Sequence, residues 1–290
     1  MKAHLIQFFI FKALFTLFNL LSFKKASSLG GWLIQKIGPF TKFNAVASSN
    51  LNIAFPNLDA NKKQSIITGM WDNLGRTIGE LCHLLKCNTA LIEKHITFHD
   101  KHNLEYLADG GFVFSAHFAN WEIAQSVFAN SQKKIYIVYQ ALNNPYLDQL
   151  VKKYRSALGA EMIAKGKAGA KKIIEAIKEK SIIIMLSDQR QTDGIIIPFF
   201  NQPCYTTTAI ANLAIKYNLP IIPIHATRNK EKFDIWIEKP LDLQLTSNKA
   251  LDIESAMMQI NKIIETWVIK NPEQWFWIHR RWSLENTHKK

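Results

Sequence analysis

Apolar residues in this chain fall alternately in short continuous runs and at helical spacing. Short runs predict strands at 111–115, 135–139, 182–186, 221–226 and 233–238. Helical spacing or helix-capping residues predict helices at 61–86, 120–128, 144–159, 168–180, 206–217 and 252–270. Helices between consecutive strands are typical of parallel crossovers, which need a covered sheet. We therefore expect an α/β protein with a mixed, largely parallel sheet covered by helices on both faces.

The N-terminal segment is more apolar than the rest. Residues 5–23 are rich in Phe and Leu and are long enough to span a bilayer. Lys12, Thr16 and Asn19 form one polar stripe, which favours a helix lying on a membrane surface or packed against its own domain. A single span and a buried helix are the alternatives, whereas the run lacks the cleavage site of a signal peptide. We expect a membrane-associating helix at 1–25 and a single domain at 26–290, without an interdomain linker.

Composition narrows the classes of partner. The chain has 36 basic and 23 acidic residues, a net charge of +13, which indicates an acidic partner such as nucleic acid, anionic lipid or an acidic carrier protein. Only 12 Gly and 9 Pro in 290 residues, with 48% hydrophobic residues, exclude a disordered or collagenous chain. Three cysteines without C-x-x-C spacing predict a reducing compartment and no structural metal.

The candidate chemistry follows the first predicted strand. His117 lies just past that strand, and Glu122 falls in the first turn of the next helix. If His117 lies in the loop between this strand and the helix, Glu122 can hold its imidazole in one tautomer and make it a general base. Amides at the start of the helix can also stabilise an oxyanion. The alternative is that Glu122 only stabilises the start of the helix by interacting with its dipole, and that its spacing from His117 is accidental. The chain has neither H-E-x-x-H nor G-x-S-x-G, so metal and serine-nucleophile chemistry are disfavoured.

The segment 117–122, HFANWE, resembles the His-x4-Asp/Glu motif of the glycerolipid acyltransferase superfamily. Its form is that of the bacterial lipid A biosynthesis (lauroyl/myristoyl) acyltransferases. The resemblance covers most of the chain, through blocks at 50–56, 73–76, 188–189, 198–200 and 272–282. The order and spacing of these blocks identify the chain as similar to that family.

The resemblance implies acyl transfer from a thioester, on acyl carrier protein, to a hydroxyl of a Kdo-bearing lipid A precursor or a related glycolipid. It implies catalysis without a cofactor or metal, at the cytoplasmic face of the inner membrane. His117 would be the general base and Glu122 its orienting carboxylate. The expected substrate-binding residues are Asn120, Arg155, Asp188 and Gln189.

Some of these roles have alternatives. Arg155 either holds a phosphate of acceptor or donor bidentately or lies on a solvated helix face. Asp188 either pairs with Arg155 or caps a turn. The tryptophans of the segment 272–282 suit either a lipid interface or a structural closing element. Nucleic acid is not expected, because no nucleic-acid motif accompanies them.

Two other functions remain open at this level. The first is an acyltransferase of the same superfamily acting on another glycolipid or on a lysophospholipid. The second is a non-catalytic membrane-surface protein that keeps the fold, against which the intact His117 and Glu122 argue.

Overall fold

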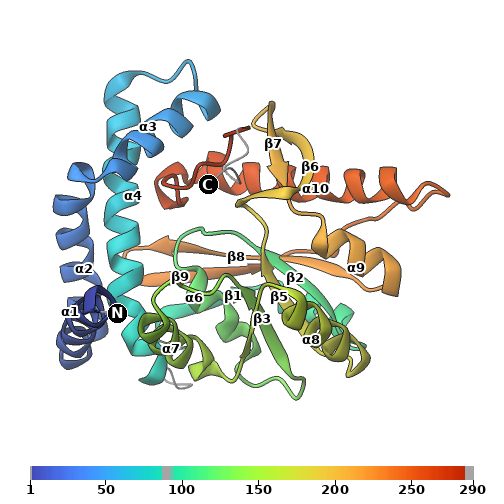
Figure 1. Cartoon of the computed structure of the whole chain (residues 1–290), viewed down its shortest axis with the longest axis horizontal. Coiled ribbons are helices and arrows are strands. Elements are labelled where there is room, and N and C mark those ends of the chain that lie inside the picture. Colours follow the sequence, from blue (N-terminus) through green and yellow to red (C-terminus); the bar gives the residue numbers. More distant parts are fainter. Residues whose placement is uncertain (1, 87–91, 93, 285–290) are drawn as a thin grey trace.

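The computed structural model describes residues 2–86, 92 and 94–284. Its main sheet has seven strands in the order β1-β9-β8-β2-β5-β3-β4 (Figure 1). Every neighbouring pair is parallel except β8 and β9, so the expected mixed, largely parallel sheet is confirmed. The strands are β1 (Ile96–His99), β2 (Gly111–Ser115), β3 (Ile135–Tyr139), β4 (Glu161–Ala164), β5 (Ile182–Leu186), β8 (Ile221–Asn229) and β9 (Lys232–Ile237).

Helices cover both faces of this sheet. The connections from β2 to β3 and from β3 to β4 run in one direction across the sheet, and those from β4 to β5 and from β5 to β8 run back. Because parallel crossovers are right-handed, the two sets of helices lie on opposite faces. One set is α6 (Trp121–Ala124) and α7 (Pro145–Arg155), and the other is α8 (Lys167–Lys178) and α9 (Ala209–Tyr217).

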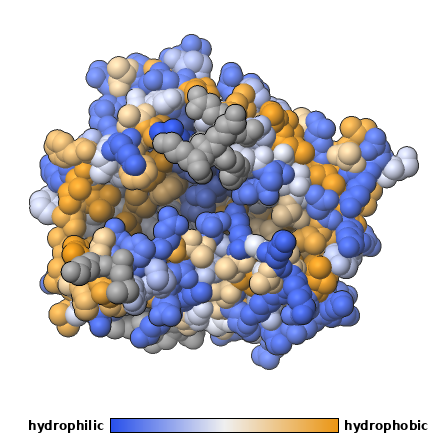
Figure 2. All heavy atoms as spheres, viewed as in Figure 1, coloured by the Kyte–Doolittle hydropathy of each residue, from blue (hydrophilic) through white to orange (hydrophobic). Residues whose placement is uncertain are grey.

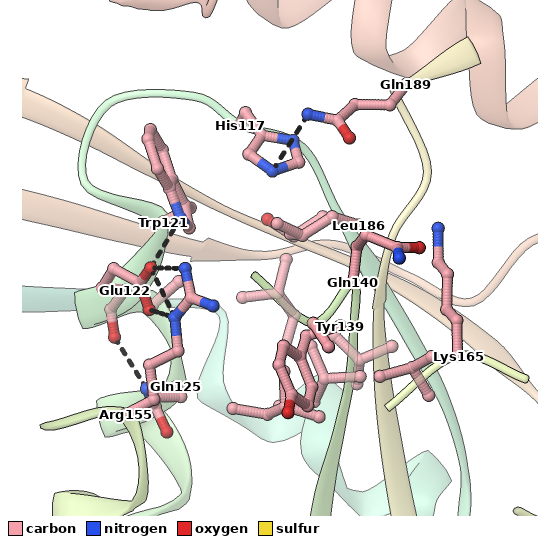
Figure 3. A pocket seen from close by; sticks show the side chains of 18 of the residues that line it. His117, Trp121, Glu122, Gln125, Tyr139, Gln140, Arg155, Lys165, Leu186 and Gln189 are labelled. Carbon is pink, nitrogen blue, oxygen red and sulfur yellow. Dashed lines mark hydrogen bonds and ion pairs between the residues drawn. The ribbon is translucent and has the colours of Figure 1, made fainter. Parts of the chain in front are cut away.

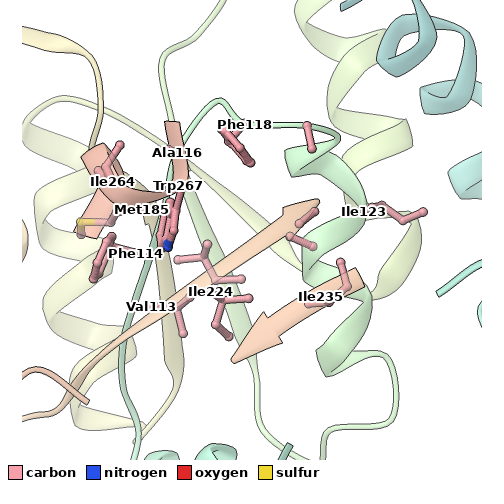
Figure 4. Close-up of a cluster of buried hydrophobic side chains, with 14 of the residues drawn as sticks. Val113, Phe114, Ala116, Phe118, Ile123, Met185, Ile224, Ile235, Ile264 and Trp267 are labelled. Atoms are coloured by element: carbon pink, nitrogen blue, oxygen red, sulfur yellow. The ribbon is translucent and has the colours of Figure 1, made fainter. Parts of the chain in front are cut away.

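Alternating side chains of the strands divide the core between the two faces (Figure 4). On one face the ring of Phe114 stacks on Trp267 of α10 (Lys249–Lys270), with 5.7 Å between ring centroids. On the other face Val113 and Ile224 lie toward α6. All of these side chains are buried. The second face is the one that holds the candidate site.

Beside the sheet stands a group of N-terminal helices (Figure 1). They are α1 (Lys2–Leu20), α2 (Phe23–Ile37), α3 (Lys42–Ala54) and α4 (Ala60–Leu81). Helices α2 and α4 cross so closely that a Cβ atom on Gly30 would lie 2.3 Å from the carbonyl oxygen of Gly75. Glycine is therefore required at this crossing. The helix predicted at 61–86 ends at Leu81 and continues as the 3₁₀ turn η2 (Cys82–Lys86).

Helix α1 is the expected N-terminal apolar helix, and it packs on the domain along one face. Phe15 and Phe18 are buried, and the side-chain amide of Asn19 lies 3.4 Å from the hydroxyl of Tyr154. Lys12 and Thr16 are exposed, so the predicted polar stripe does not form one contact face. The window Ala3–Leu20 has a mean hydropathy of 1.5 with 11% of it buried, and by length and composition alone it could cross a membrane.

The sequence pattern predicts neither β1 nor β4, and it also misses one hairpin. Strands β6 (Arg190–Phe199) and β7 (Gln202–Thr206) form a separate antiparallel pair. Helix α9 consequently begins at Ala209, not at 206, because Thr206 still belongs to β7. The remaining short elements are η1 (Gly38–Phe40), η3 (Lys101–Leu107), η4 (Gln125–Phe128), η5 (Ser156–Leu158) and η6 (Pro272–Gln274).

Candidate active site

The site is built on the carboxyl ends of two neighbouring parallel strands. Ser115 of β2 pairs in register with Leu186 of β5. His117 and Asp188 each follow those residues by two positions, so the strand register brings them together. The Nδ1 atom of His117 lies 2.8 Å from Asp188 Oδ1, and the backbone N–H of His117 donates to Oδ2 at 2.9 Å.

Asp188 is buried and ionised. Burial by itself would raise its pKa, but the charge of His117 in its protonated form and hydrogen bonds from His117 and from the Trp275 indole lower the pKa to about 2. A carboxylate only accepts hydrogen bonds, so in the neutral form of His117 the proton stays on Nδ1 and Nε2 presents its lone pair. This is the tautomer that a general base requires.

The structure corrects the partner predicted for His117. Glu122 lies on α6, and its two oxygens, at 2.9 and 3.0 Å, share the N–H of Arg155 Nε. Glu122 also accepts from Arg155 Nη2 and, at 2.9 Å, from the Trp121 indole. Figure 3 shows this pair on the wall beside His117. His117 and Glu122 are close in the sequence, but Asp188, which follows the neighbouring strand β5, is the carboxylate that contacts Nδ1 of His117. Glu122 holds Arg155 instead.

Arg155 is therefore neither on a solvated face nor paired with Asp188. Its side chain is 22% exposed, and that of Glu122 is 8% exposed. The desolvation of Arg155 is outweighed by the charge and hydrogen bonds of Glu122, so the pKa of Arg155 is raised. The guanidinium fork predicted for a phosphate is already engaged by a carboxylate.

Asn120 also points into the protein and not toward a substrate. Its side-chain oxygen caps α6 by accepting from the amides of Glu122 and Ile123, and its Nδ2 donates to Glu80 at 2.6 Å. These two amides were expected to stabilise an oxyanion, but Asn120 uses them. Asn120 shapes the loop that carries His117.

Gln189, another predicted substrate-binding residue, lies on the Nε2 side of His117. Its Nε2 lies 3.4 Å from Nε2 of His117 (Figure 3). An amide N–H directed at a lone pair agrees with the tautomer deduced above. A substrate hydroxyl approaching His117 would meet the Gln189 amide at the same place.

The C-terminal tail fixes the loop of His117 from the other side. Ala119 adopts a positive φ of 49°, and its amide donates to the carbonyl of Gln274 at 2.7 Å. The amide of Phe276 donates to the carbonyl of His117 at 3.0 Å. Trp275 is 1% exposed and bonds Asp188, a role that the sequence did not predict.

The tail tryptophans are thus structural, which excludes a lipid interface for them. Trp277 is fully buried and Trp282 is 8% exposed. The guanidinium of the buried Arg281 donates to Thr206 Oγ1 at 2.8 Å and to the carbonyl of Tyr205. The aromatic block closes the hairpin β6–β7 onto α10 and the site.

A cavity of about 410 Å³ opens beside His117. It lies between the sheet and α6, and Figure 3 shows Glu122 and Arg155 on one wall opposite Tyr139 and Lys165. Such a volume is typical of small-ligand pockets, which span about 300–1,000 Å³. Its lining combines polar side chains with apolar ones, and the apolar ones include Val113, Phe128, Ile137, Ile184, Leu186 and Ile224.

Comparison with known proteins covers nearly the whole chain. Residues 2–283 match the family described as bacterial lipid A biosynthesis acyltransferase. A lipid A biosynthesis acyltransferase of Haemophilus influenzae is 24% identical over 89% of this chain and 83% of its own length. The lipid A biosynthesis palmitoleoyltransferase of Escherichia coli is 23% identical over 84% and 80%, and the lauroyltransferase of the same organism is 20% identical over 82% and 78%.

Proposed function

The chain belongs to the bacterial lipid A biosynthesis acyltransferase family, and we propose that it moves a fatty acyl group from a thioester to a hydroxyl of a lipid A precursor, with His117 as general base and Asp188 as its partner. The observation that carries this proposal is the His117–Asp188 pair beside a cavity that is lined in large part by apolar side chains. The carboxylate that orients the base is Asp188, while Glu122 holds Arg155 in the cavity wall.

The proposed reaction is a direct transfer. The acceptor hydroxyl replaces Gln189 at Nε2 of His117 and loses its proton to that nitrogen as its oxygen attacks the thioester carbonyl. The imidazolium is stabilised by Asp188. When the carbon–sulfur bond breaks, the imidazolium returns the proton to the leaving thiolate. The Gln189 amide, 3.4 Å from Nε2, is the proposed donor to the carbonyl oxygen as negative charge develops on it.

The donor chain would occupy the 410 Å³ cavity. Each methylene that leaves water for such a lining contributes about 0.8 kcal/mol. Since His117 lines the cavity, a chain inside it holds its carbonyl carbon near the base. Acyl carrier protein is the proposed donor, because an acidic carrier complements a chain of net charge +13.

Membrane association is the remaining part of the proposal. Ile6, Phe9, Ile10, Leu17 and Leu20 of α1 are 46–80% exposed. We place this helix at the cytoplasmic face of the inner membrane, where a water-soluble carrier and a lipid acceptor meet. Residues 1–25 would then be the membrane-associating helix and 26–290 the catalytic domain. Another glycolipid or a lysophospholipid is the alternative acceptor, because acceptor choice depends on the shape of the site.

The test is transfer of a radiolabelled acyl group from acyl carrier protein to a Kdo-lipid A precursor. Replacing His117 with alanine should lower kcat by about 10²–10⁴-fold, the usual contribution of a general base. His99→Ala is the matched control, since His99 is stacked on Trp236 and bonds Asp234 outside the site. Near-normal turnover by folded His117→Ala protein would overturn the mechanism. If the wild type transferred no acyl group, the proposed acceptor or the proposed donor would be wrong.

A further inference from the structure

A second cavity lies under the N-terminal helix. It has a volume of about 360 Å³ and is enclosed by α1, α4 and α7. Each of the three helices contributes apolar side chains to the lining, for example Phe15, Ile78 and Leu150. Apart from Thr77 and the Glu122–Arg155 pair, all lining side chains are aliphatic or aromatic. Phe11 and Leu142, which are 40% and 45% exposed, also line it, so the cavity reaches the surface beside α1.

The two cavities share one wall. Trp121, Glu122, Leu142 and Arg155 line both the cavity of His117 and the cavity under α1. In Figure 3 the Glu122–Arg155 pair stands on the wall of the first cavity next to His117. The pair is held by several hydrogen bonds and by the Trp121 indole, so it forms a fixed partition.

We propose that the cavity under α1 receives a hydrocarbon chain of the acceptor lipid, and that the Glu122–Arg155 partition keeps this chain apart from the donor chain. The inference rests on the function proposed above. Two chains must approach one base in that reaction, and the structure has an apolar space on each side of a wall that begins at Trp121. The ring of Trp121 lies 5.2 Å from that of His117, centroid to centroid.

The occupant is a lipid chain and not a headgroup. The lining offers no charge except the partition, in which each charge already has its partner. The opening lies beside the exposed apolar side chains of α1, from which a membrane lipid can enter without crossing water. Bilayer tails are as apolar as this lining, so entry gains little transfer free energy. The main role of the cavity is therefore to orient the acceptor, and not to draw it out of the bilayer.

Photolabelling tests this placement without requiring turnover. The probe is a glucosamine phosphate lipid whose 3-hydroxyacyl chain ends in a diazirine, presented in vesicles with full-length protein. A long-chain acyl-pantetheine thioether fills the donor cavity. We expect labels within 74–81 and 147–151. Labels on Phe128, Ile137 or Ile184 in the presence of the thioether, or only on the exposed side of α1, would overturn the inference.

A filled cavity gives the second readout. Val151→Trp places a bulky ring in the cavity, and Gln149→Trp, on the exposed side of α7, is its matched control. Val151→Trp should abolish the labels and lower kcat/KM for a long-chain acceptor by about 10²-fold, the effect of a small misplacement of reactants. With a soluble short-chain 3-hydroxyacyl acceptor, Val151→Trp should be as active as the wild type. Equal losses on both acceptors in folded protein would contradict the inference, while absent wild-type transfer with labels at 74–81 or 147–151 would contradict only the proposed function.

Discussion

Asp188 keeps a negative charge inside the protein because three N–H groups point at it. They come from the backbone and ring of His117 and from Trp275. Its pKa of about 2 lies below the ordinary 3.8, so the carboxylate remains ionised throughout the neutral range. Its contribution to folding is therefore present above pH 3.8 and is lost as the pH falls toward 2.

Replacing Asp188 with asparagine should remove this charge while keeping the volume. The amide can donate to Nδ1 of His117, which moves the ring proton to Nε2 and leaves no base. We expect kcat to fall by about 10⁴-fold, as occurs when a catalytic histidine is held in the wrong tautomer. The measurement is acyl transfer together with circular dichroism. Asp193→Asn, on the exposed part of β6, is the control, and turnover by Asp188→Asn equal to this control would refute the pairing.

Among the elements, α4 connects the N-terminal helices to the site. Its Glu80 is fully buried and accepts from Ser27 of α2 and Asn120 before α6, both at 2.6 Å. It also forms an ion pair with Arg228 of β8, which donates from Nη2 at 2.9 Å. One carboxylate thus joins three other elements.

Glu80→Gln should destabilise the protein markedly. The amide cannot neutralise Arg228, whose side chain is only 6% exposed, and removing one member of a buried ion pair costs about 3–5 kcal/mol. The free energy of unfolding in urea measures this loss. Glu105→Gln, at an exposed position of η3, should change it by less than about 0.5 kcal/mol. A similar stability for the two variants would show that the Glu80 network is not required.

At the same scale, the sequence predicts some elements and not others. Strands β2, β3 and β5 have the bounds predicted for them, because each is an uninterrupted apolar run buried on both faces. The hairpin β6–β7 escapes prediction because its exposed residues and its facing prolines, Pro198 and Pro203, do not resemble a strand.

The pairing of His117 with Asp188 was not predicted, for a topological reason. His117 and Asp188 are separated by 71 positions and meet because β2 and β5 are neighbours, which no local pattern specifies. A signal was nevertheless present, since each residue follows a buried strand by two positions. The contact would follow for any strand arrangement in which β2 and β5 are parallel, adjacent and in register. The structure brings His117 and Gln189 together, whereas Glu122 binds Arg155 and not His117.

Part of the surface formed by the N-terminal helices is strongly apolar. Figure 2 shows hydrophobic residues gathered over the region of α1 and α2, while hydrophilic residues surround the central recess. Trp32 and Ile37 of α2 are more than half exposed, and Phe40 of η1 is 92% exposed. These side chains extend the apolar surface of α1, as expected of a protein that lies against a bilayer.

Ile6, Phe9 and Ile10, each 61% exposed, provide the test of that orientation. Changing all three to serine should weaken binding to anionic phospholipid vesicles by at least tenfold in a sedimentation assay, because their apolar surface would otherwise leave water. Serines at Leu251, Met258 and Ile269 of α10, which are 44–58% exposed, form the matched control. Equal effects of the two triple variants would place the membrane contact elsewhere.

The contact between the tail and the loop of His117 also sets an order of assembly. Gln274, Trp275 and Phe276 are translated after every strand of the sheet, yet they pair with residues that leave the ribosome more than 150 positions earlier. Contacts so distant along the chain form slowly and late in folding. The sheet can therefore assemble during synthesis with the loop of His117 still loose, and this loop is fixed only when the tail docks. The loop of His117 thus reaches its final conformation only after residues 274–276 have been made and have docked.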